Sequence, residues 1–156
     1  MDASGYNMSM GRIKLRSATH HDSHAIVDVL HRAFEEYRGK LQPPSGAHAE
    51  REETIRALFE DGEGAIVAEE DDSGAMVGCV FYRLQTDDRD TCYLHRLAVV
   101  PEARSQGLAS ALVQEVESTA RAQGLDYVTL GVRIVVTNNR SFYLKRGYYP
   151  VAYAAH

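Results

Sequence analysis

Apolar residues recur every three or four positions in several stretches of the chain, and this spacing predicts amphipathic helices. Asp22 stands before the first stretch, where its carboxylate can accept a hydrogen bond from an unpaired backbone N–H. Gly124 stands after the third stretch, where a glycine commonly ends a helix. The predicted helices cover residues 22–37, 47–60, 107–123 and 137–146.

Between these helices the pattern changes to short apolar runs and to alternation of apolar and polar residues, which predict β-strands. A turn at residues 71–74, Asp-Asp-Ser-Gly, separates two of the runs and predicts an antiparallel hairpin. The strands on either side of the third helix should be parallel, because a helical crossover joins them. The predicted strands cover residues 12–18, 65–69, 75–84, 91–100, 127–136 and 148–153.

The order of these elements predicts one α/β domain over residues 12–156, preceded by a flexible polar tail over residues 1–11. Its sheet should be mixed and mostly antiparallel, with a central parallel βαβ unit and flanking helices. A chain of 156 residues is long enough for one core and too short for two ordinary domains.

Composition narrows the classes of partner. Charged residues make up 25% of the chain and the net charge is −5, with no block of basic residues, so we expect no nucleic-acid or membrane partner. Two cysteines are too few for a disulfide scaffold, and the first dozen residues lack an apolar signal core, so we expect a cytoplasmic protein. The seven histidines show no zinc-ligand spacing, and we expect no metal.

Candidate chemistry lies just after the strand 91–100, because ligands of parallel βαβ units bind beyond the carboxyl ends of the strands. Gly107 allows close approach of a ligand, and the helix that begins there offers unpaired N–H groups and a partial positive charge. Arg104 adds a guanidinium that matches phosphate oxygens. The P-loop and dinucleotide patterns are absent, so the sequence favours another phosphate ligand, although a plain loop with a surface arginine has the same residues.

Two segments carry a resemblance to a known family. Residues 99–109, Val-Val-Pro-Glu-Ala-Arg-Ser-Gln-Gly-Leu-Ala, resemble the acyl-CoA-binding signature of the GNAT superfamily of N-acetyltransferases, with Arg-x-x-Gly-x-Ala as its last part. Residues 139–148 are similar to the superfamily's Asn…Tyr…Gly-aromatic segment. With the element order, the resemblance covers roughly residues 13–151. Ala109 replaces the commoner glycine, and the spacing of four from Asn139 to Tyr143 is shorter than in many relatives.

The resemblance implies acetyl-CoA as the acyl donor and assigns its contacts. The backbone of the strand before the loop would pair with the pantetheine arm, the loop amides would hold the pyrophosphate between two flanking side chains, Arg104 and Gln106, and Asn139 would contact the middle of the arm. Small residues at the start of the helix would leave the approach open. The implied cofactor-binding residues are Leu97, Ala98, Val99, Arg104, Ser105, Gln106, Gly107, Leu108, Ala109, Ser110 and Asn139.

The resemblance also implies the chemistry, which is direct attack of a primary amine on the thioester. In the superfamily this strand usually carries a bulge that splays it from the next strand and opens a cleft for the thioester. An amide of the strand, at Val99, would polarise the thioester carbonyl, and Tyr143 would protonate the leaving thiolate. Many relatives have a Glu on this strand, but residues 91–100 contain no carboxylate. His95 has the right ordinary pKa for the base, while a structural histidine, or a water chain to a distant carboxylate, fits the sequence as well.

The acceptor side is less specific. Glu35, Glu36 and Glu50 could attract a cationic amine or simply form a solvated surface. The entrance should be lined by Tyr37, Arg38, Gln42 and the turn at residues 43–46. The resemblance also implies a homodimer, since edge strands of this fold often pair between subunits. The alternative to an enzyme is a sensor or partner module of the same fold that binds acyl-CoA without turnover, because the strand lacks a carboxylate.

Overall fold

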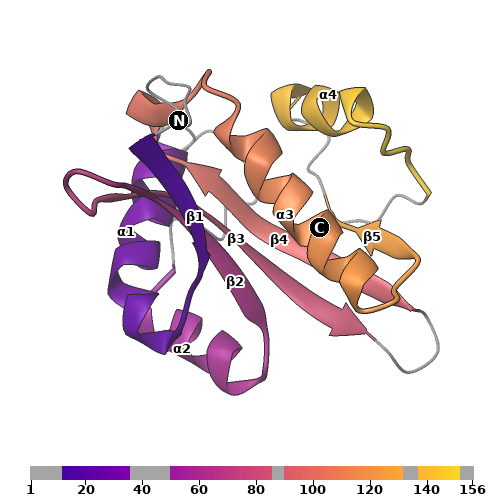
Figure 1. Ribbon diagram of the computed structural model, residues 1–156, viewed down its shortest axis with the longest axis horizontal. Helices are drawn as coiled ribbons and strands as arrows, with labels where there is room; N and C mark the ends of the chain where they lie inside the picture. Colours follow the sequence, from indigo (N-terminus) through magenta and orange to yellow (C-terminus); the bar gives the residue numbers. More distant parts are fainter. Residues whose placement is uncertain (1–11, 36–49, 86–89, 132–136, 152–156) are drawn as a thin grey trace.

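The computed structural model describes residues 12–35, 50–85, 90–131 and 137–151. Five strands form one sheet in the order β1-β2-β3-β4-β5 (Figure 1). The first four pair antiparallel, and β5 is parallel to β4, so the predicted α/β class with a mixed sheet and a parallel βαβ unit is confirmed. The strands are β1 (Ile13–Ser17), β2 (Gly64–Glu70), β3 (Met76–Gln85), β4 (Thr91–Val99) and β5 (Tyr127–Thr129).

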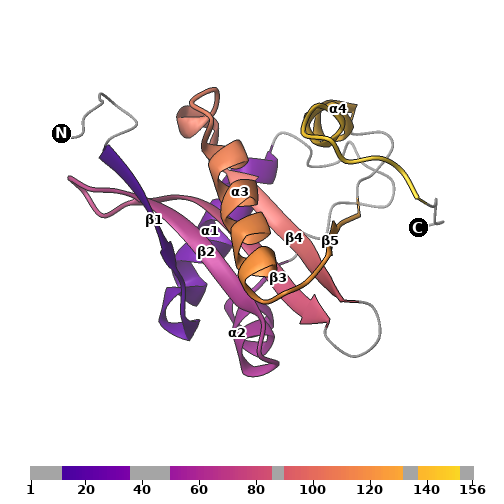
Figure 2. The same cartoon turned by 45° about the vertical axis from the view of Figure 1, so that its right-hand side comes forward.

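Helices cover both faces of this sheet (Figure 2). Phe59 of α2 packs on Phe81 of β3 with ring centroids 5.3 Å apart, which places α2 on one face. Leu112 of α3 lies on the other face, where its Cδ1 would be 3.2 Å from a Cβ added at Gly78. The helices are α1 (Ser23–Phe34), α2 (Glu52–Glu60), α3 (Leu108–Ala122) and α4 (Thr137–Lys145), with short 3-10 turns η2 (His20–Asp22) and η5 (Pro101–Ala103).

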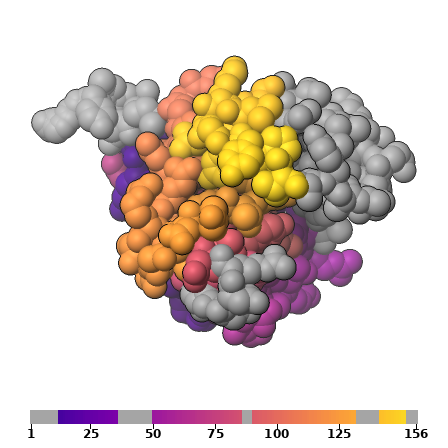
Figure 3. All heavy atoms as spheres, turned by 90° about the vertical axis from the view of Figure 1, so that its right-hand side faces the viewer, coloured from indigo at the N-terminus to yellow at the C-terminus, as the bar shows by residue number. Residues whose placement is uncertain are grey.

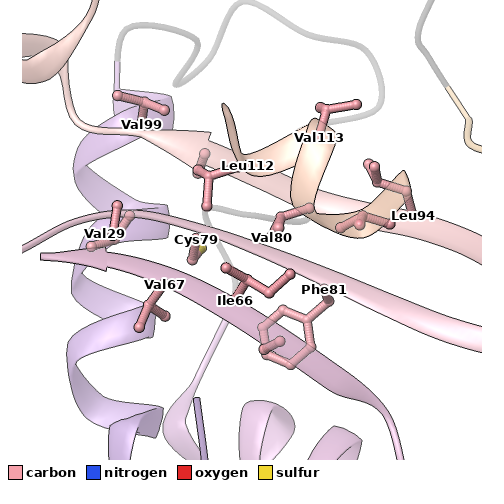
Figure 4. Close-up of a cluster of buried hydrophobic side chains, with 14 of the residues drawn as sticks. Val29, Ile66, Val67, Cys79, Val80, Phe81, Leu94, Val99, Leu112 and Val113 are labelled. Atoms are coloured by element: carbon pink, nitrogen blue, oxygen red, sulfur yellow. The ribbon is translucent and has the colours of Figure 1, made fainter. Parts of the chain in front are cut away.

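The core lies between the sheet and its helices (Figure 4). Its central side chains, such as Phe81, Val80 and Leu112, have no exposed surface. Fully burying a side chain of this size stabilises the fold by about 1.5–3 kcal/mol. Because alternate residues of β3 face opposite helices, this one strand joins the two layers and fixes the position of β4 beside it.

Three details of the predicted elements are wrong. Asp22 does not cap α1 with its side chain: its carboxylate accepts hydrogen bonds from Arg16 and from the Thr19 N–H, and Thr19 caps η2 instead. The second helix begins at Glu52, later than predicted. Residues 148–151 form no strand, because the Tyr148 side chain is bound to α3 and Pro150 has no N–H to donate.

The other predicted elements agree with the structure to within about one residue at their described ends, except that β5 ends at Thr129 and residues 130–131 of the predicted strand 127–136 form no strand. The helix 107–123 is found as α3, and Gly124 follows it with φ of 75°. The tail 1–11, the helix start 47–49, and residues 132–136 and 152–153 of the predicted strands lie outside the described residues.

Candidate functional site

The strand β4 carries a β-bulge near its centre. The register of β4 on β3 shifts by one residue between Cys79 and Phe81. Over this stretch β4 has Arg96 and Leu97 opposite the single residue Val80. Arg96 has φ of 55°, in the left-handed region that non-glycine residues rarely occupy. Such outliers are concentrated at functional sites, so the bulge marks β4 as a candidate.

Beyond the bulge, β4 presents main-chain groups at its outer edge. The Val100 N–H donates to the Val77 carbonyl at 3.0 Å, and because the ladder alternates, the N–H and C=O of Val99 point away from β3. Among the residues that the structure describes, the pairing of β5 on that outer side is confined to residues 91–93 of β4. The geometry therefore directs the Val99 N–H to the edge where the sequence predicts the thioester.

The loop after β4 is shaped for an anion by its backbone. Ser105 and Gly107 have φ of 65° and 76°, and a Cβ added at Gly107 would meet nothing within 4 Å. The first backbone hydrogen bond of α3 runs from the Ala111 N–H to the Gly107 carbonyl, so the N–H groups of the first turn are not used within the helix. That turn carries no acidic residue and no side-chain cap. A phosphate group suits this arrangement.

Arg104, predicted beside the pyrophosphate, points toward α1. Its Nε donates to the Val99 carbonyl at 3.1 Å, and its Nη2 donates to the Ala33 carbonyl at 2.6 Å. Arg32 adds a second link, an ion pair with Glu102 of η5. The loop is thus tied both to the last turn of α1 and to the outer edge of β4.

The remaining predicted cofactor residues differ in exposure. Ala98 and Leu108 are buried in the core, and the alternation that turns the N–H and C=O of Val99 outward turns those of Ala98 toward β3. Leu97, Gln106, Ala109 and Ser110 are half-buried, and Ser105 is exposed. Asn139 lies in α4, and its side chain falls outside the described residues.

Tyr143, the predicted acid, lies on α4 and is 8% exposed. Its ring packs edge-on against Phe142 and Tyr148, with centroids 5.0 and 5.6 Å away. Burial raises the pKa of the Tyr143 hydroxyl well above its ordinary value, so the group is protonated throughout the physiological range. It can therefore donate a proton or a hydrogen bond but cannot act as a base there.

An anchor formed by Glu117, Arg146 and Tyr148 holds the end of α4 on α3. The Tyr148 hydroxyl donates to Glu117 Oε2 at 2.8 Å, and Arg146 Nη2 donates to Oε1 at 3.3 Å. Figure 3 shows the yellow α4 segment resting on the orange α3 and β5 segments. Because the Tyr148 N–H also binds the Tyr143 carbonyl at 3.1 Å, the anchor fixes the backbone of Tyr143.

His95, the predicted base, lies in a polar chain on the α2 face of the sheet. Its Nε2 is 2.5 Å from Glu63 Oε1, and its Nδ1 is 2.8 Å from Arg96 Nη1. A guanidinium can only donate, so Nδ1 accepts and the ring proton lies on Nε2, donated to Glu63. Burial is the main cause that lowers the pKa of His95, and Arg96 also lowers it, whereas Glu63 opposes the shift. Both ring nitrogens are therefore occupied.

Glu50 is not available to attract a cationic amine. Its side chain is 6% exposed, and it accepts a hydrogen bond from Arg96 Nε at 2.5 Å. His31 of α1 binds the Glu50 carbonyl at 2.8 Å. Glu36 and residues 37–46, predicted at the acceptor entrance, lie outside the described residues, and Glu35 is exposed.

Sequence reasoning missed Glu63 and Arg96. Glu63 precedes β2 and is distant in sequence from His95, yet its carboxylate is only 5% exposed and binds that ring. The one available signal was a carboxylate between two glycines, Gly62 and Gly64. Arg96 reads as an ordinary polar strand residue, and nothing in its neighbours indicates a left-handed backbone.

The two cysteines are buried free thiols. Burial raises the pKa of Cys79 to about 12 and that of Cys92 to about 11, which keeps both as unreactive thiols at neutral pH. In residues 12–35, 50–85, 90–131 and 137–151, no three His, Cys, Asp or Glu residues are grouped as metal ligands would be. No helix of the same residues is both long and apolar enough to cross a membrane.

Comparison with known proteins gives a family. The acetyltransferase (GNAT) family matches residues 24–148, a span that includes the bulge, the loop and α4. No curated protein matches the chain.

Solved structures share the fold. PaiA N-acetyltransferase from Thermoplasma acidophilum, in complex with coenzyme A, is 18% identical with a TM-score of 0.72, over 86% of this chain and 87% of that one. An aminoglycoside acetyltransferase from an uncultured soil sample is 18% identical with a TM-score of 0.68, over 92% and 96%. A ribosomal-protein-alanine N-acetyltransferase from Brucella melitensis is 16% identical with a TM-score of 0.68, over 92% and 96%. At these identities the likeness shows the fold alone.

Proposed function

The chain belongs to the acetyltransferase (GNAT) family, and on that premise we propose that it transfers an acetyl group from acetyl-CoA to a primary amine. The observation that carries this proposal is the loop after β4, where Ser105 and Gly107 have positive φ at an uncapped helix start. A neighbour of the same fold is named as a complex with coenzyme A, which supports the choice of donor.

In the proposed complex the pyrophosphate lies on the backbone amides of residues 104–109. Its negative charge is favoured there by the unpaired N–H groups and the dipole of α3. The pantetheine arm runs along the outer edge of β4, pairing with the backbone of residues 97–99. Arg104 and Gln106 flank the phosphates and Asn139 contacts the arm. The Arg104 guanidinium already donates to the Val99 and Ala33 carbonyls, so this role requires it to donate to a phosphate oxygen as well.

The reaction is then a direct transfer. The neutral amine nitrogen attacks the thioester carbonyl carbon, and the oxygen of the tetrahedral intermediate accepts a hydrogen bond from the Val99 N–H. The C–S bond breaks, the sulfur leaves as a thiolate, and the new C–N bond gives the acetamide. The nitrogen loses one proton and the thiolate gains one, so the products are the amide and free CoA thiol.

Two side chains handle these protons in the proposal. His95 keeps its hydrogen bond from Nε2 to Glu63 and accepts the proton of the amine on Nδ1. To do so, Nδ1 must first give up its hydrogen bond from Arg96 Nη1. Tyr143 donates to the leaving sulfur. An ordinary tyrosine has a pKa of about 10 and a thiol about 8.5, and burial widens this gap. The hydroxyl therefore stabilises the thiolate through a hydrogen bond as the C–S bond breaks. The proton that completes the CoA thiol comes from solvent, which in turn takes the amine proton from His95.

The biological setting is also proposed. Named neighbours act on an aminoglycoside and on a ribosomal protein alanine, so the acceptor could be a small molecule or a protein terminus, and we propose only a primary amine. Two buried free cysteines suit the reducing cytoplasm. The outer edge of β1, an end strand of the sheet, suits pairing in a homodimer.

Release of free thiol from acetyl-CoA in the presence of a panel of small amines and peptides tests the proposal. Acetylation of at least one amine, identified by mass spectrometry, supports it. A second candidate is an acyl-CoA-binding module without turnover, which the occupation of both His95 nitrogens favours. Saturable acetyl-CoA binding with no transfer to any amine would support the module and refute the enzyme.

A further inference from the structure

The bulge in β4 decides which main-chain groups face the candidate site. Val99 is opposite Gly78, and the Val100 N–H binds the Val77 carbonyl. If the extra residue were absent, the register of the first half of β4 would continue and Val99 would be opposite Val77. Its N–H would then point at β3, because a shift of one residue exchanges the inward and outward groups of a strand.

The left-handed backbone that makes the bulge belongs to Arg96, and this conformation is unfavourable for a residue with a side chain. Glycine would adopt it without strain. The structure must therefore supply other interactions that hold residue 96 in place.

Those interactions are made by the Arg96 guanidinium. Its Nε donates to Glu50 Oε1 at 2.5 Å, and its Nη1 donates to His95 Nδ1 at 2.8 Å. Neither partner is loose: the Glu50 carbonyl is bound by His31 of α1, and His95 is bound by Glu63 at the start of β2. The Cys79 thiol also donates to the backbone carbonyl of Arg96, with Sγ 3.6 Å from the oxygen, so the backbone of this residue is held directly as well.

We propose that Arg96 is a positioning residue whose guanidinium, clamped between Glu50 and His95, holds the β4 bulge and thereby turns the Val99 N–H to the outer edge of the sheet. This inference rests on the proposed function for its catalytic consequence. The clamp also links Glu50, which comes four residues after the predicted acceptor segment in the sequence, to the strand predicted to bind the donor.

The test compares Arg96→Val with Arg96→Gly. Both variants lack the guanidinium, so they leave His95 with the same loss of a partner and differ chiefly in backbone preference. The strain of a non-glycine residue in the left-handed region lowers the ratio of bulged to unbulged β4 by about 5- to 30-fold. We therefore expect Arg96→Val to turn over acetyl-CoA more slowly than Arg96→Gly by this factor. Asp90→Val and Asp90→Gly form the matched control, because Asp90 also has positive φ, 51°, and should show equal turnover in the two variants.

Hydrogen exchange of backbone amides, followed by NMR, gives a readout that needs no activity. In the unmodified protein the Val100 amide should be protected and the Val99 amide should exchange faster. In Arg96→Val this order should reverse or the rates should converge, while Arg96→Gly should keep it. Glu50→Gln, which retains Arg96 but removes one charged partner, should move the ratio of the two rates in the same direction by a smaller amount.

Equal exchange ratios in Arg96→Val and Arg96→Gly, or an unchanged ratio in Glu50→Gln, would overturn the inference. If Arg96→Val does not fold, the Glu50→Gln ratio alone decides. If the unmodified protein shows no acetyl transfer, the proposed function fails, but the exchange ratios still decide whether Arg96 sets the bulge.

Discussion

The two ends of the candidate site use different chemical groups, backbone N–H groups at the loop after β4 and polar side chains at the bulge. At the loop after β4, the groups proposed to hold the donor are backbone N–H groups, exposed by the conformation of Ser105 and Gly107. At the bulge, four side chains from three separate parts of the chain meet: Glu50 before α2, Glu63 before β2, and His95 and Arg96 of β4. A backbone site needs only a short, local pattern of residues. A side-chain cluster needs the whole fold in place, because its members are distant in sequence. The sequence around each member therefore shows no local pattern that reveals the cluster.

We expect the largest effect from a change in the loop after β4, where backbone groups are proposed to hold the donor. Gly107→Glu places a side chain at φ of 76° and a negative charge where the phosphates should lie. We expect it to weaken acetyl-CoA binding by about 100-fold or more, because charge-assisted hydrogen bonds contribute about 1.5–3 kcal/mol each. Calorimetric titration measures this effect.

Gly124→Glu is the matched control for that variant. Gly124 lies at the other end of the same helix with φ of 75°, and a Cβ there would also meet nothing within 4 Å. Both variants should lose similar stability, of about 1–2 kcal/mol. Equal acetyl-CoA affinities of the two variants would mean that the loop is not the binding site.

Tyr143 lies on α4 and belongs to neither end, so a variant at this position separates turnover from acetyl-CoA binding. Tyr143→Phe removes only the hydroxyl, and we expect turnover to fall by about 100-fold with acetyl-CoA affinity within about threefold of normal. Steady-state kinetics and calorimetry separate the two quantities. Tyr127→Phe, on a side chain that is 61% exposed, should change neither. Near-normal turnover of Tyr143→Phe would reduce this residue to a core position.

Arg104 tests whether the backbone end also depends on a side chain. Arg104→Ala removes donors to the Val99 and Ala33 carbonyls, and we expect acetyl-CoA affinity to fall about 10-fold. Acetylpantetheine, which lacks the pyrophosphate, identifies the cause. A loss confined to acetyl-CoA assigns Arg104 to the phosphates, while an equal loss for both donors means that it acts by holding Val99. Arg121→Ala, on the exposed end of α3, is the control and should bind both normally.

The smallest expected effect is the dependence of stability on pH at the bulge. Burial and the charges of Arg96 and Arg83 lower the pKa of His95, against the attraction of Glu63, and Tyr93 stacks on the ring. The unfolded chain therefore binds a proton at a higher pH than the folded protein does. Stability is fully present above the ordinary histidine pKa of about 6.5 and is lost as pH falls from there through the folded pKa.

Urea unfolding at several pH values between 7 and 5 measures this dependence. His95→Gln should flatten the fall in the free energy of unfolding, whereas the exposed His24→Gln should leave it unchanged. A dependence that His95→Gln leaves intact would assign the fall to other groups and remove His95 from the explanation.

The sequence predicted the two features that depend on local rules. The helix α3 follows from apolar spacing and Gly124, and the loop before it follows from Gly107 and the motif around Arg104. It also predicted a strand at residues 148–153, which is wrong for 148–151 because Tyr148 binds Glu117 on α3. Local alternation of residues carries no information on such a contact between distant elements.

The side chains that meet at the bulge could not be predicted for the same reason. His95 was singled out from its ordinary pKa, but its protonation depends on Glu63 and Arg96, which reach it only through the folded sheet. Glu50 looked like a surface charge because it lies in a polar segment, whereas the fold buries it against Arg96. In both cases hydrogen bonds to charged partners decide the role of the residue, and this pairing is a property of the tertiary structure.

The central claim is that the loop at the start of α3 binds the pyrophosphate of coenzyme A. Calorimetric titration of the unmodified protein with acetyl-CoA, repeated with Gly107→Glu, tests it most directly. The account predicts saturable binding with a Kd within about 1 µM to 1 mM, as is common for enzyme substrates, and loss of that binding in the variant. No binding of acetyl-CoA at millimolar concentration, or equal binding by the variant, would contradict it.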